Sequence, residues 1–468
     1  MWSGFEKFSV QIFQFIISII LARLLSPKDF GVIAIVLVLM NIIQVFNEGG
    51  FAEALMKKLD RDNLDYSTVF YFNILFSIIL YIILYVSAPY IANYFNLLQL
   101  INLLRLLGIN IIITSFVVVQ RTILTINVDF KTQAKASFIG IIIGGIIGIY
   151  CANKNLEAFS IVAQYLSSNL VTTIFIWIFS SWKPSFQFSF SRLKILFDYA
   201  YKLILARFVN VLFSEIYSIA IGKYYSPIQL GYFNRAKSFI GISSNNITSI
   251  VQRVSTPVLC KFQNDNKMMG EMLIKFIQKT SMLVFPLLFG LFVLSESFVY
   301  VILGPKWLST AWILQSLCPV GILYVFSTFN MNIFNATGKT NLALQSELIK
   351  KVINIIIIIT AISINFKFLI LSQILVALIE FFINTWYTKK QIDLNWKKQV
   401  KSVFPIIISS LIMCFVVYLT TVKLESNIIK LFTGIFIGFI SYSILCYIFN
   451  ISQSKIFINK YIKRLVNN

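Results

Sequence analysis

Polar side chains that fall inside long apolar segments are the residues of this chain with the clearest capacity for chemistry. Such groups are costly to place in hydrocarbon, so they are read first as functional. Residues three or four apart share a helix face, and two of the apolar segments each carry a polar face of this kind. We interpret both faces as lining a cavity for a polar molecule; the alternative is that small polar groups hold neighbouring helices together. The first face comprises Gln11, Gln14, Ser18 and Ala22, and the second comprises Arg207, Asn210, Ser214, Tyr217 and Ser218.

Charged side chains within the apolar segments indicate what such a cavity would accept. Arg105 lies about seven residues inside the segment 98–119, roughly 10 Å from its start at about 1.5 Å per residue. Arg235 and Lys237 lie similarly within the segment 231–250. Guanidinium groups bind phosphate through two parallel hydrogen bonds, which favours an anionic substrate. The embedded charges are of both signs, so this preference is modest: Glu48, Glu53, Arg105, Arg207, Glu215, Arg235, Lys237, Glu347 and Glu380.

The embedded acids have different expected roles. Glu48 and Glu215 are the candidates for pairing with the embedded arginines. Glu215 lies about 140° from Asn210 on a helical wheel, a position that turns it toward a neighbouring helix rather than the cavity. Glu347 and Lys351 are spaced four residues apart near a helix end, so we expect them to form a local ion pair.

The elements that position these residues must be membrane-spanning helices. Hydrophobic residues make up 58% of the chain and charged residues 12%, against about 45–50% and about 25% in ordinary soluble proteins. Apolar runs of the roughly 20 residues that a helix needs to cross a bilayer recur along the whole chain. The composition therefore predicts an all-α polytopic membrane protein.

Charge and cysteine content exclude several other classes. The net charge of +22 does not indicate nucleic-acid binding, because the Lys and Arg residues sit in short loops between apolar segments. The five cysteines are scattered without a C-x-x-C spacing, so neither a disulfide framework nor a metal site is predicted. The chain has no histidine, the commonest metal ligand and general base. We expect no cofactor.

We predict about fourteen spans from the apolar runs. Lys and Arg concentrate in cytoplasmic loops of membrane proteins. Most of the 40 Lys and Arg residues fall on one side of the membrane if the N-terminus is cytoplasmic, and both termini are then cytoplasmic. The predicted spans are residues 8–25, 31–47, 68–88, 98–119, 136–152, 157–179, 203–222, 231–250, 277–302, 311–334, 343–363, 368–388, 403–421 and 428–450.

The first of these spans is repeated 200 residues later. Residues 6–31 and 206–231 share eight identities in 26 ungapped pairs, and both end in S-P-x-x-Φ-G, where Φ is an apolar residue. Ser26 is a suitable helix N-cap, Pro27 fits the first helical position, and Asp29 lies where a capping-box side chain folds back. We interpret the match as an internal duplication; the alternative is that one good inter-helix turn is used twice.

The duplication predicts the domain organisation. Residues 1–179 would form an N-terminal lobe of six helices, and residues 203–388 a second lobe in the same orientation, as in parallel transporter repeats. The basic, aromatic segment 180–202 joins them, as an amphipathic helix on the cytoplasmic surface or as a solvated linker. Residues 389–468 would add two more spans and a basic cytoplasmic tail.

Several segments, in this order and spacing, resemble the polysaccharide exporters of the MOP superfamily. The closest resemblance is to oligosaccharide-lipid flippases of the Wzx type, in the branch that exports colanic-acid-like repeat units, and it covers essentially the whole chain. FNEGGF also resembles a motif that closes helix two in lipid II flippases. Its NEGGF part has no counterpart in the repeat, because residues 247–251 read ITSIV. The segments are RLLSPKDFG (23–31), FNEGGFAEALMKK (46–58), DFKTQAKAS (129–137), PVLCKFQND (257–265), FPLLFGL (285–291) and LGPKWLSTAWILQSL (303–317).

The resemblance implies a two-lobed, fourteen-helix flippase of the bacterial inner membrane. Its substrate would be an undecaprenyl-pyrophosphate-linked oligosaccharide for O-antigen, capsule or exopolysaccharide, moved by alternating access along an ion gradient. Its partners would be the bilayer, the lipid-linked substrate and the polysaccharide polymerase and chain-length machinery. The cavity residues would be Gln14, Ser18, Arg105, Arg207, Asn210, Ser214, Arg235 and Lys237, with Glu48 and Glu215 as the ion-coupling or structural acids.

Two other functions are alternatives to the flippase. A multidrug exporter of the same superfamily would move cationic compounds instead of glycolipids. A membrane glycan polymerase or ligase would be an enzyme, but the chain has no Walker sequence and no large loop, so we expect no enzymatic activity.

Overall fold

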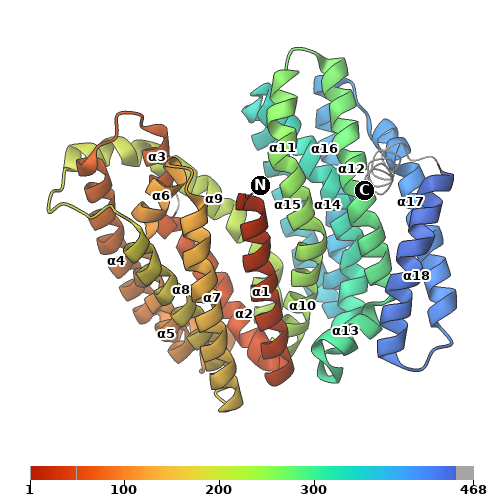
Figure 1. Cartoon of the computed structure of the whole chain (residues 1–468), viewed down its shortest axis with the longest axis horizontal. Helices are drawn as coiled ribbons and strands as arrows, with labels where there is room; N and C mark the ends of the chain where they lie inside the picture. Colours follow the sequence, from red (N-terminus) through yellow and green to blue (C-terminus); the bar gives the residue numbers. More distant parts are fainter. Residues whose placement is uncertain (1, 49, 450–468) are drawn as a thin grey trace, which may run out of the picture. The chain divides into compact units, whose positions relative to one another are not determined.

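The computed structural model describes residues 2–48 and 50–449, with the side chains of residues 2–9, Glu48 and Thr340 excepted. Throughout this described part the regular structure is helical, which confirms the predicted all-α class. The chain forms two compact units that divide after Gly231 (Figure 1). Each unit is described by itself below.

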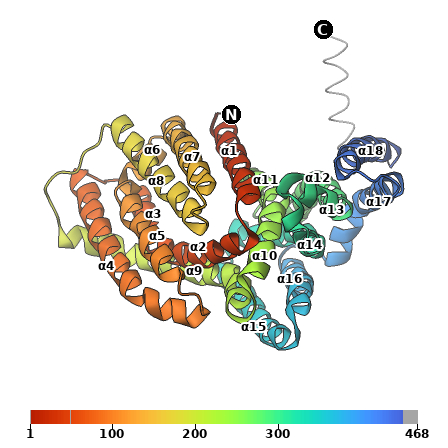
Figure 2. The same cartoon turned by 90° about the horizontal axis from the view of Figure 1, so that it is seen from below.

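The N-terminal unit is a bundle in which sequence neighbours form antiparallel pairs. α4 packs against α5 and α7 against α8, while α1 packs on α7 and α2 on α9. Figures 1 and 2 both show α7 and α8 side by side. The helices are α1 (Trp2–Leu24), α2 (Pro27–Glu48), α3 (Phe51–Lys57), α4 (Asn63–Phe95), α5 (Leu100–Ser115), α6 (Val118–Ile126), α7 (Phe130–Asn153), α8 (Ala158–Phe179), α9 (Phe190–Tyr224) and the start of α10 (Pro227–Ile240).

Both copies of the repeated turn form the predicted capping box. The Ser26 backbone N–H donates to Asp29 Oδ2 at 2.9 Å, and the Asp29 N–H donates to Ser26 Oγ at 3.3 Å. The Ser226 N–H donates to Gln229 Oε1 at 3.1 Å, and the Gln229 N–H donates to Ser226 Oγ at 3.2 Å. Each box satisfies two backbone donors that a helix start leaves open, so α2 and α10 begin at their prolines as predicted.

The two repeated turns also meet one another within the N-terminal unit. A Cβ atom added to Gly31 would lie 1.6 Å from the Pro227 carbonyl oxygen. A Cβ added to Gly231 would lie 2.0 Å from the Pro27 carbonyl oxygen. The contact is reciprocal, because each glycine admits the backbone of the other copy's proline. The final glycine of S-P-x-x-Φ-G is therefore explained by close approach of two helix starts.

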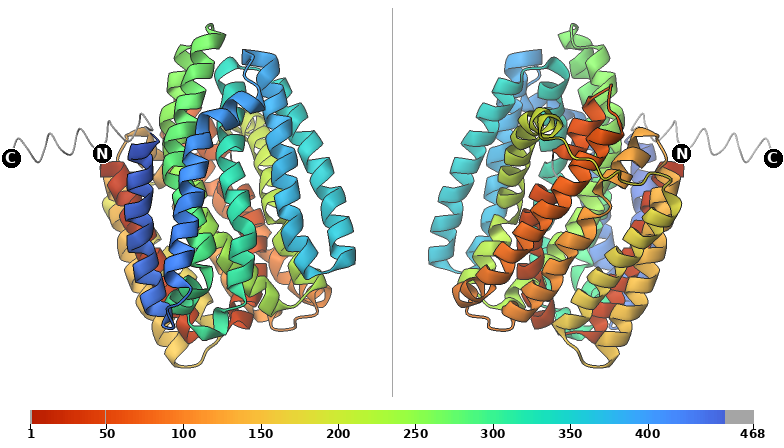
Figure 3. Two further views of the ribbon diagram at one scale, coloured as in Figure 1. Left: turned by 90° about the vertical axis from the view of Figure 1, so that its right-hand side faces the viewer. Right: turned by 90° about the vertical axis from the view of Figure 1, so that its left-hand side faces the viewer.

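The C-terminal unit is built on α14, which packs against α11, α12 and α16. α17 packs on α12 and α18, and α17 and α18 run alongside each other in Figure 3. Within this unit one helix is widened into a π-helical turn, a feature frequent at functional sites. The elements after α10 are η1 (Gly241–Asn246), α11 (Ile247–Lys261), α12 (Asn266–Val293), α13 (Ser295–Leu303), η2 (Pro305–Trp307), α14 (Thr310–Thr337), α15 (Thr340–Ile364), α16 (Phe366–Ile392), α17 (Trp396–Thr421) and α18 (Asn427–Ile448).

The described residues contain ten helices long and apolar enough to cross a membrane, or eleven if the bent pair α5 and α6 forms one span. The predicted number of fourteen spans is thus not confirmed. The other three predicted spans coincide with α1, with α10, η1 and α11 together, and with α15. The chain is a multi-pass helical membrane protein.

The segment 180–202 does not form an element of its own. Residues 180–189 are irregular, and α9 then runs without interruption from Phe190 through the span predicted at 203–222. α9 packs against α2, α3 and α4. α9, the helix that corresponds to α1 in the repeat, therefore belongs to the N-terminal unit.

Candidate functional site

A line of polar contacts follows α9 where it packs on α2 and α3, and we call this line the polar seam. At the end of the seam nearer the last residue of α9, Glu215 Oε1 accepts a hydrogen bond from Asn41 Nδ2 of α2 at 3.5 Å. Glu215 Oε2 accepts from Ser218 Oγ, one turn further along α9, at 3.2 Å. Glu215, an acid predicted from the sequence, thus faces a neighbouring helix and is held by two neutral donors.

An ion pair lies at the other end of the seam. Arg207 of α9 donates to Glu53 Oε1 of α3 at 2.5 Å, and Glu53 Oε2 also accepts from the Gly50 backbone N–H at 3.1 Å. Eight residues separate Arg207 from Glu215, which is about 12 Å along the helix. Both partners are partly exposed, Arg207 at 47% and Glu53 at 31% of their side-chain surface. The pair is therefore accessible to a polar ligand rather than sealed in the core.

The break between α2 and α3 brings α9 close enough to form the seam. Gly50 has φ +95°, in the region that favours glycine, and a Cβ there would lie 2.5 Å from the Ala200 carbonyl oxygen. Buried apolar side chains from both sides pack around this contact, among them Phe51, Leu55 and Leu196. Replacing Gly50 would both strain the backbone and push α9 away from α3.

A buried amide fixes the end of α2 just before this break. Asn47 Nδ2 donates to the Ile111 carbonyl at 3.0 Å and to Thr114 Oγ1 at 3.1 Å, both on α5. Asn47 Oδ1 accepts from Ser77 Oγ of α4 at 2.9 Å. Asn47 is 2% exposed, so these bonds satisfy an amide that would otherwise be costly to bury. They lock α2 against α4 and α5.

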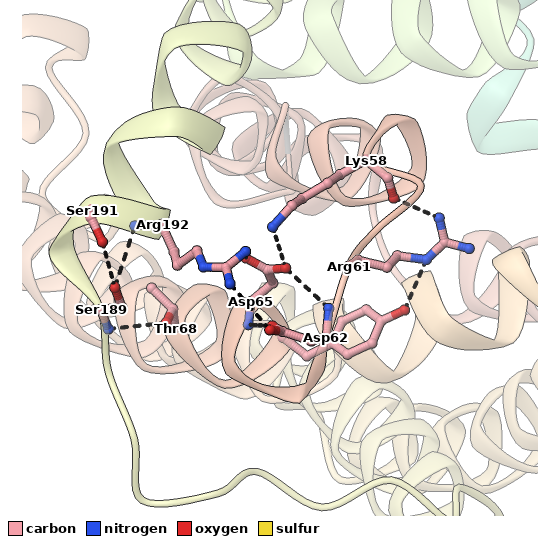
Figure 4. Close-up of polar contacts among 9 residues, drawn as sticks. Lys58, Arg61, Asp62, Asp65, Thr68, Ser189, Ser191 and Arg192 are labelled. Carbon is pink, nitrogen blue, oxygen red and sulfur yellow. Dashed lines mark hydrogen bonds and ion pairs between the residues drawn. The ribbon is translucent and has the colours of Figure 1, made fainter.

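A second polar cluster, the charged clamp, holds the start of α9 to the start of α4 (Figure 4). Lys58 Nζ contacts Asp65 Oδ2 at 2.5 Å, and Asp65 is fully buried. Arg192 of α9 reaches Asp62 Oδ2 at 3.3 Å and Asp65 Oδ1 at 3.6 Å. The Asp65 backbone N–H and the Arg192 guanidinium hold the pKa of the Asp62 carboxyl below its ordinary value. Asp65 thus has a cation on each side.

The irregular residues 180–189 are tied to the same end of α4. The Ser185 N–H donates to Ser67 Oγ at 2.9 Å, and the Ser189 N–H donates to Thr68 Oγ1 at 3.2 Å. Trp182 Nε1 donates to Asn63 Oδ1 at 2.7 Å. These bonds and the charged clamp together anchor the first turns of α9, so its later residues are presented to α2 in a fixed register.

An apolar groove adjoins the polar seam. It has a volume of about 430 Å³ and is lined by α2, α4 and α9, including Ile42, Tyr94 and Leu212. Ser218 also lines this groove, and it is the residue that donates to Glu215. Lys223 Nζ donates a hydrogen bond to the Tyr94 carbonyl oxygen and lies 4.2 Å from the centroid of the Tyr94 ring. Polar seam and apolar groove therefore meet at one residue.

The cavity residues predicted on α1 and α9 have different surroundings. Gln14 is exposed and Ser18 is half-buried on α1, which packs on α7. Asn210 and Ser214 are exposed on α9, which packs on α2, α3 and α4. Asn210 and Ser214 thus lie on the helix of the seam, whereas the residues of α1 lie on a helix with other neighbours.

Arg105 and Arg207 are not brought together. Arg105 Nε donates to the Tyr85 carbonyl at 3.4 Å, and its guanidinium lies 4.1 Å from the Tyr85 ring centroid. Tyr85 is in the last third of α4, whereas Glu53, which holds Arg207, precedes the first residue of α4. The two arginines therefore lie toward opposite ends of this 33-residue helix.

The remaining predicted residues lie elsewhere. Arg235 and Lys237 are half-buried on α10, in the part of the chain assigned to the C-terminal unit. The side chain of Glu48 lies outside the described residues, although its backbone ends α2.

Sequence reasoning missed several residues that position the site. Asn41 and Asn47 are polar residues in the apolar run of α2, and a polar residue in such a run is a local sequence signal for a polar contact. Asp62 and Asp65 form a D-x-x-D capping pattern before an apolar run. Their partner Arg192 is 130 residues from Asp62, and no local pattern connects residues so distant.

Comparison with known proteins identifies related families and structures. Residues 20–312 match the family described as polysaccharide biosynthesis protein. The teichuronic acid biosynthesis protein TuaB of Bacillus subtilis is 26% identical over 344 residues, 73% of this chain and 71% of TuaB. The succinoglycan biosynthesis transport protein ExoT of Rhizobium meliloti is 26% identical over 330 residues, 70% of this chain and 67% of ExoT.

Among solved structures, the lipid II flippase MurJ in its inward closed conformation has the same fold. The TM-score is 0.77 at 20% identity, over 98% of this chain and 99% of MurJ. The likeness agrees with the helical architecture described above. Because the family match covers more than half of the sequence, this chain belongs to the family of polysaccharide biosynthesis proteins.

Proposed function

We propose that this protein is a flippase for an undecaprenyl-pyrophosphate-linked oligosaccharide. It would move the repeat unit of a surface polysaccharide from the cytoplasmic to the outer leaflet of the bacterial inner membrane. The mechanism would be alternating access between two lobes, residues 1–179 and 203–388, driven by a Na⁺ or H⁺ gradient. Both termini would be cytoplasmic, and a polysaccharide polymerase with its chain-length machinery would receive the product.

The observation that carries this proposal is the meeting of the polar seam and the apolar groove at Ser218. A substrate with a charged sugar-bearing head and a long hydrocarbon tail needs both surfaces on the same helices. Arg207, with 47% of its side-chain surface exposed, could exchange Glu53 for a phosphate oxygen, since guanidinium binds both groups through the same paired geometry. TuaB and ExoT are named for polysaccharide biosynthesis and transport, which supports the same substrate class.

Reconstitution in vesicles tests the proposal. Purified full-length protein is incorporated into liposomes that contain a fluorescent undecaprenyl-pyrophosphate-linked trisaccharide. We expect a membrane-impermeant quencher to reach the inner-leaflet probe only in vesicles that contain the protein. Protection equal to that in protein-free vesicles would contradict the proposal. Accumulation of a cationic dye without glycolipid movement would instead identify a multidrug exporter.

A charge exchange tests the role of Arg207 in that assay. Arg207→Glu places two carboxylates together at the seam, so we expect the flipping rate to fall at least about tenfold, the equivalent of about 1.4 kcal/mol. The double variant Glu53→Arg with Arg207→Glu restores opposite charges and should recover most of the rate. The pair is exposed and contributes only about 0–1 kcal/mol to folding, so both variants should remain folded.

Lys194→Glu is the matched control, because Lys194 is an exposed lysine of α9. It makes the same change in sign on the same helix outside the seam. Equal losses in Arg207→Glu and Lys194→Glu would mean that the rate responds to net charge rather than to the Glu53 pair.

A further inference from the structure

Four ionisable side chains gather on α15 and α16 of the C-terminal unit, and the polar seam uses none of them. Lys350 forms an ion pair with Glu347, three residues before it, and only 6% of the Lys350 side-chain surface is exposed. Its Nζ also lies 3.8 Å from Met331 Sδ of α14. Glu380 is half-buried on α16, which packs against α15, and it lies within electrostatic reach of Lys350 and Glu347. We call Glu347, Lys350, Lys351 and Glu380 together the α15–α16 charge cluster.

Glu380 lies near the middle of its helix. Glu380 is 14 residues from Phe366 and 12 from Ile392, the two ends of α16. These separations correspond to about 21 Å and about 18 Å along the helix. In a span of this length the side chain falls at the depth of the hydrocarbon core. Charges at that depth are costly and mark ion or proton pathways by default.

The two carboxylates of the cluster have different numbers of ammonium neighbours. Glu347 has two ammonium neighbours, since Lys350 is paired with it and Lys351 also interacts with it. Glu380 has Lys350 alone among these lysines, and it shares that ammonium with Glu347. A buried charge that is only partly paired is strongly disfavoured. Glu380 is therefore the group of this cluster that one additional positive charge would stabilise most.

The other elements packed on α16 supply little charge at this depth. α14 carries no Asp, Glu, Lys or Arg between Thr310 and Thr337, and its titratable groups are Cys318 and Tyr324. α12 has its charged residues within 267–279, and Lys279, the one that lies midway along this helix, is exposed. The charged residues of α17 lie within 397–401, near one end of that helix. On α16 itself, the charged residues besides Glu380 are Lys367, Lys389 and Lys390, and the titratable Tyr387 lies five residues before the end of the helix at Ile392.

A stripe of buried polar groups runs from Glu380 toward the end of α16. Asn384, Thr388 and Gln391 follow it at intervals of three or four residues, so all lie on one helix face. Asn384 is 1% exposed, and neither its Nδ2 nor its Oδ1 has a hydrogen-bond partner. Thr388 Oγ1 and Gln391 Nε2 are likewise buried without partners. Water satisfies such groups in folded proteins, and a file of water beside a carboxyl group can conduct protons.

We propose that Glu380 is a proton-binding site, with Lys350 as its counterion and the Asn384–Gln391 stripe as its access path. A proton from water forms an O–H bond with one Glu380 oxygen, and release to water breaks that bond; no electron is transferred. When Glu380 is protonated, Lys350 pairs with Glu347 alone. When Glu380 is ionised, it draws the ammonium toward α16. That this proton drives transport rests on the proposed flippase function, whereas the site itself does not.

Infrared difference spectra of the purified full-length protein in lipid test the site directly. We expect the wild-type protein to keep a protonated carboxyl band at pH values where exposed carboxyls are ionised and to lose it as the pH rises further, and we expect Glu380→Gln to lack this band. Glu296→Gln is the control, because Glu296 is an exposed carboxylate in the first turn of α13, and it should keep the band. A band retained by Glu380→Gln, or absent from the wild type at every pH, would overturn the assignment.

A second variant keeps the test decisive if Glu380→Gln does not fold. Lys350→Met removes the ammonium that favours the ionised carboxyl, so the band should persist to higher pH than in the wild type. An unchanged midpoint would contradict the role of Lys350. Replacing K⁺ by Na⁺ should leave the band unchanged, and its loss would assign the site to Na⁺ instead. The spectra require no substrate, so their outcome is independent of the vesicle flipping assay.

Discussion

Replacing Gly31 by alanine should destabilise the protein by more than about 2 kcal/mol, even though alanine is the better helix former by about 1 kcal/mol. The new Cβ would lie 1.6 Å from the Pro227 carbonyl oxygen and 2.5 Å from its carbonyl carbon. Both are backbone atoms, so no side chain can rotate away, and the starts of α2 and α10 must separate. Overpacking of this kind costs about 1–3 kcal/mol and sometimes more. Thermal unfolding of the purified protein, followed by tryptophan fluorescence, should show a lowered midpoint.

Gly270→Ala provides the matched control. Gly270 is a helical glycine of α12 with no atom within 4 Å of an added Cβ. The helix preference then acts alone, and the unfolding midpoint should stay equal or rise. Equal midpoints for Gly31→Ala and Gly270→Ala would mean that the repeated turns do not approach as closely as described.

This contact illustrates which parts of the fold the sequence predicts. The capping boxes at Ser26 and Ser226 were predictable because every atom involved lies within four residues. The repeat also identified two equivalent helix starts. It did not show that these starts touch, because a duplication specifies similarity between copies and says nothing of their distance. The close approach of Gly31 and Pro227 is a tertiary fact that only the fold provides.

The position of Arg105 shows how strongly a site prediction depends on helix boundaries. From the apolar run alone the residue appears deep within a span that begins at residue 98. In the structure α5 begins at Leu100, so Arg105 lies in its second turn, beside Tyr85 of α4. An error of two residues in the predicted start of a helix changes the distance of a side chain from the helix end by about 3 Å. The aromatic partner could not be inferred either, because Tyr85 is exposed on another helix.

The charged residues show a third limit. A helix brings both the third and the fourth neighbour of Glu347 within reach, so sequence spacing predicts an ion pair with Lys351 and equally allows one with Lys350. The structure describes the Glu347–Lys350 pair, in which Lys350 lies on the buried side of α15. Glu380 joins this cluster from α16, and only packing between the two helices reveals it.

Removing Asp65 should have the largest effect of any single charge deletion in the N-terminal unit. Asp65 is fully buried between Lys58, with 14% of its side-chain surface exposed, and Arg192. Asp65→Ala would leave the Lys58 ammonium in a nearly closed site without its carboxylate. Breaking a buried pair from one side costs about 3–5 kcal/mol, because the remaining charge is uncompensated. We expect that loss in the free energy of unfolding, measured by chemical denaturation in detergent.

Two further variants separate burial from charge in that prediction. Asp60→Ala removes an exposed carboxylate from the loop that precedes α4 and should change stability by less than about 0.5 kcal/mol. The double variant Lys58→Met with Asp65→Leu removes both charges together, so no buried charge is left alone, and it should recover most of the stability. If the double variant were as unstable as Asp65→Ala, the loss would come from the helix start that Asp65 caps rather than from the charged clamp. Since the clamp anchors α9, Asp65→Ala should also lower flipping in step with the loss of the ordered start of α9.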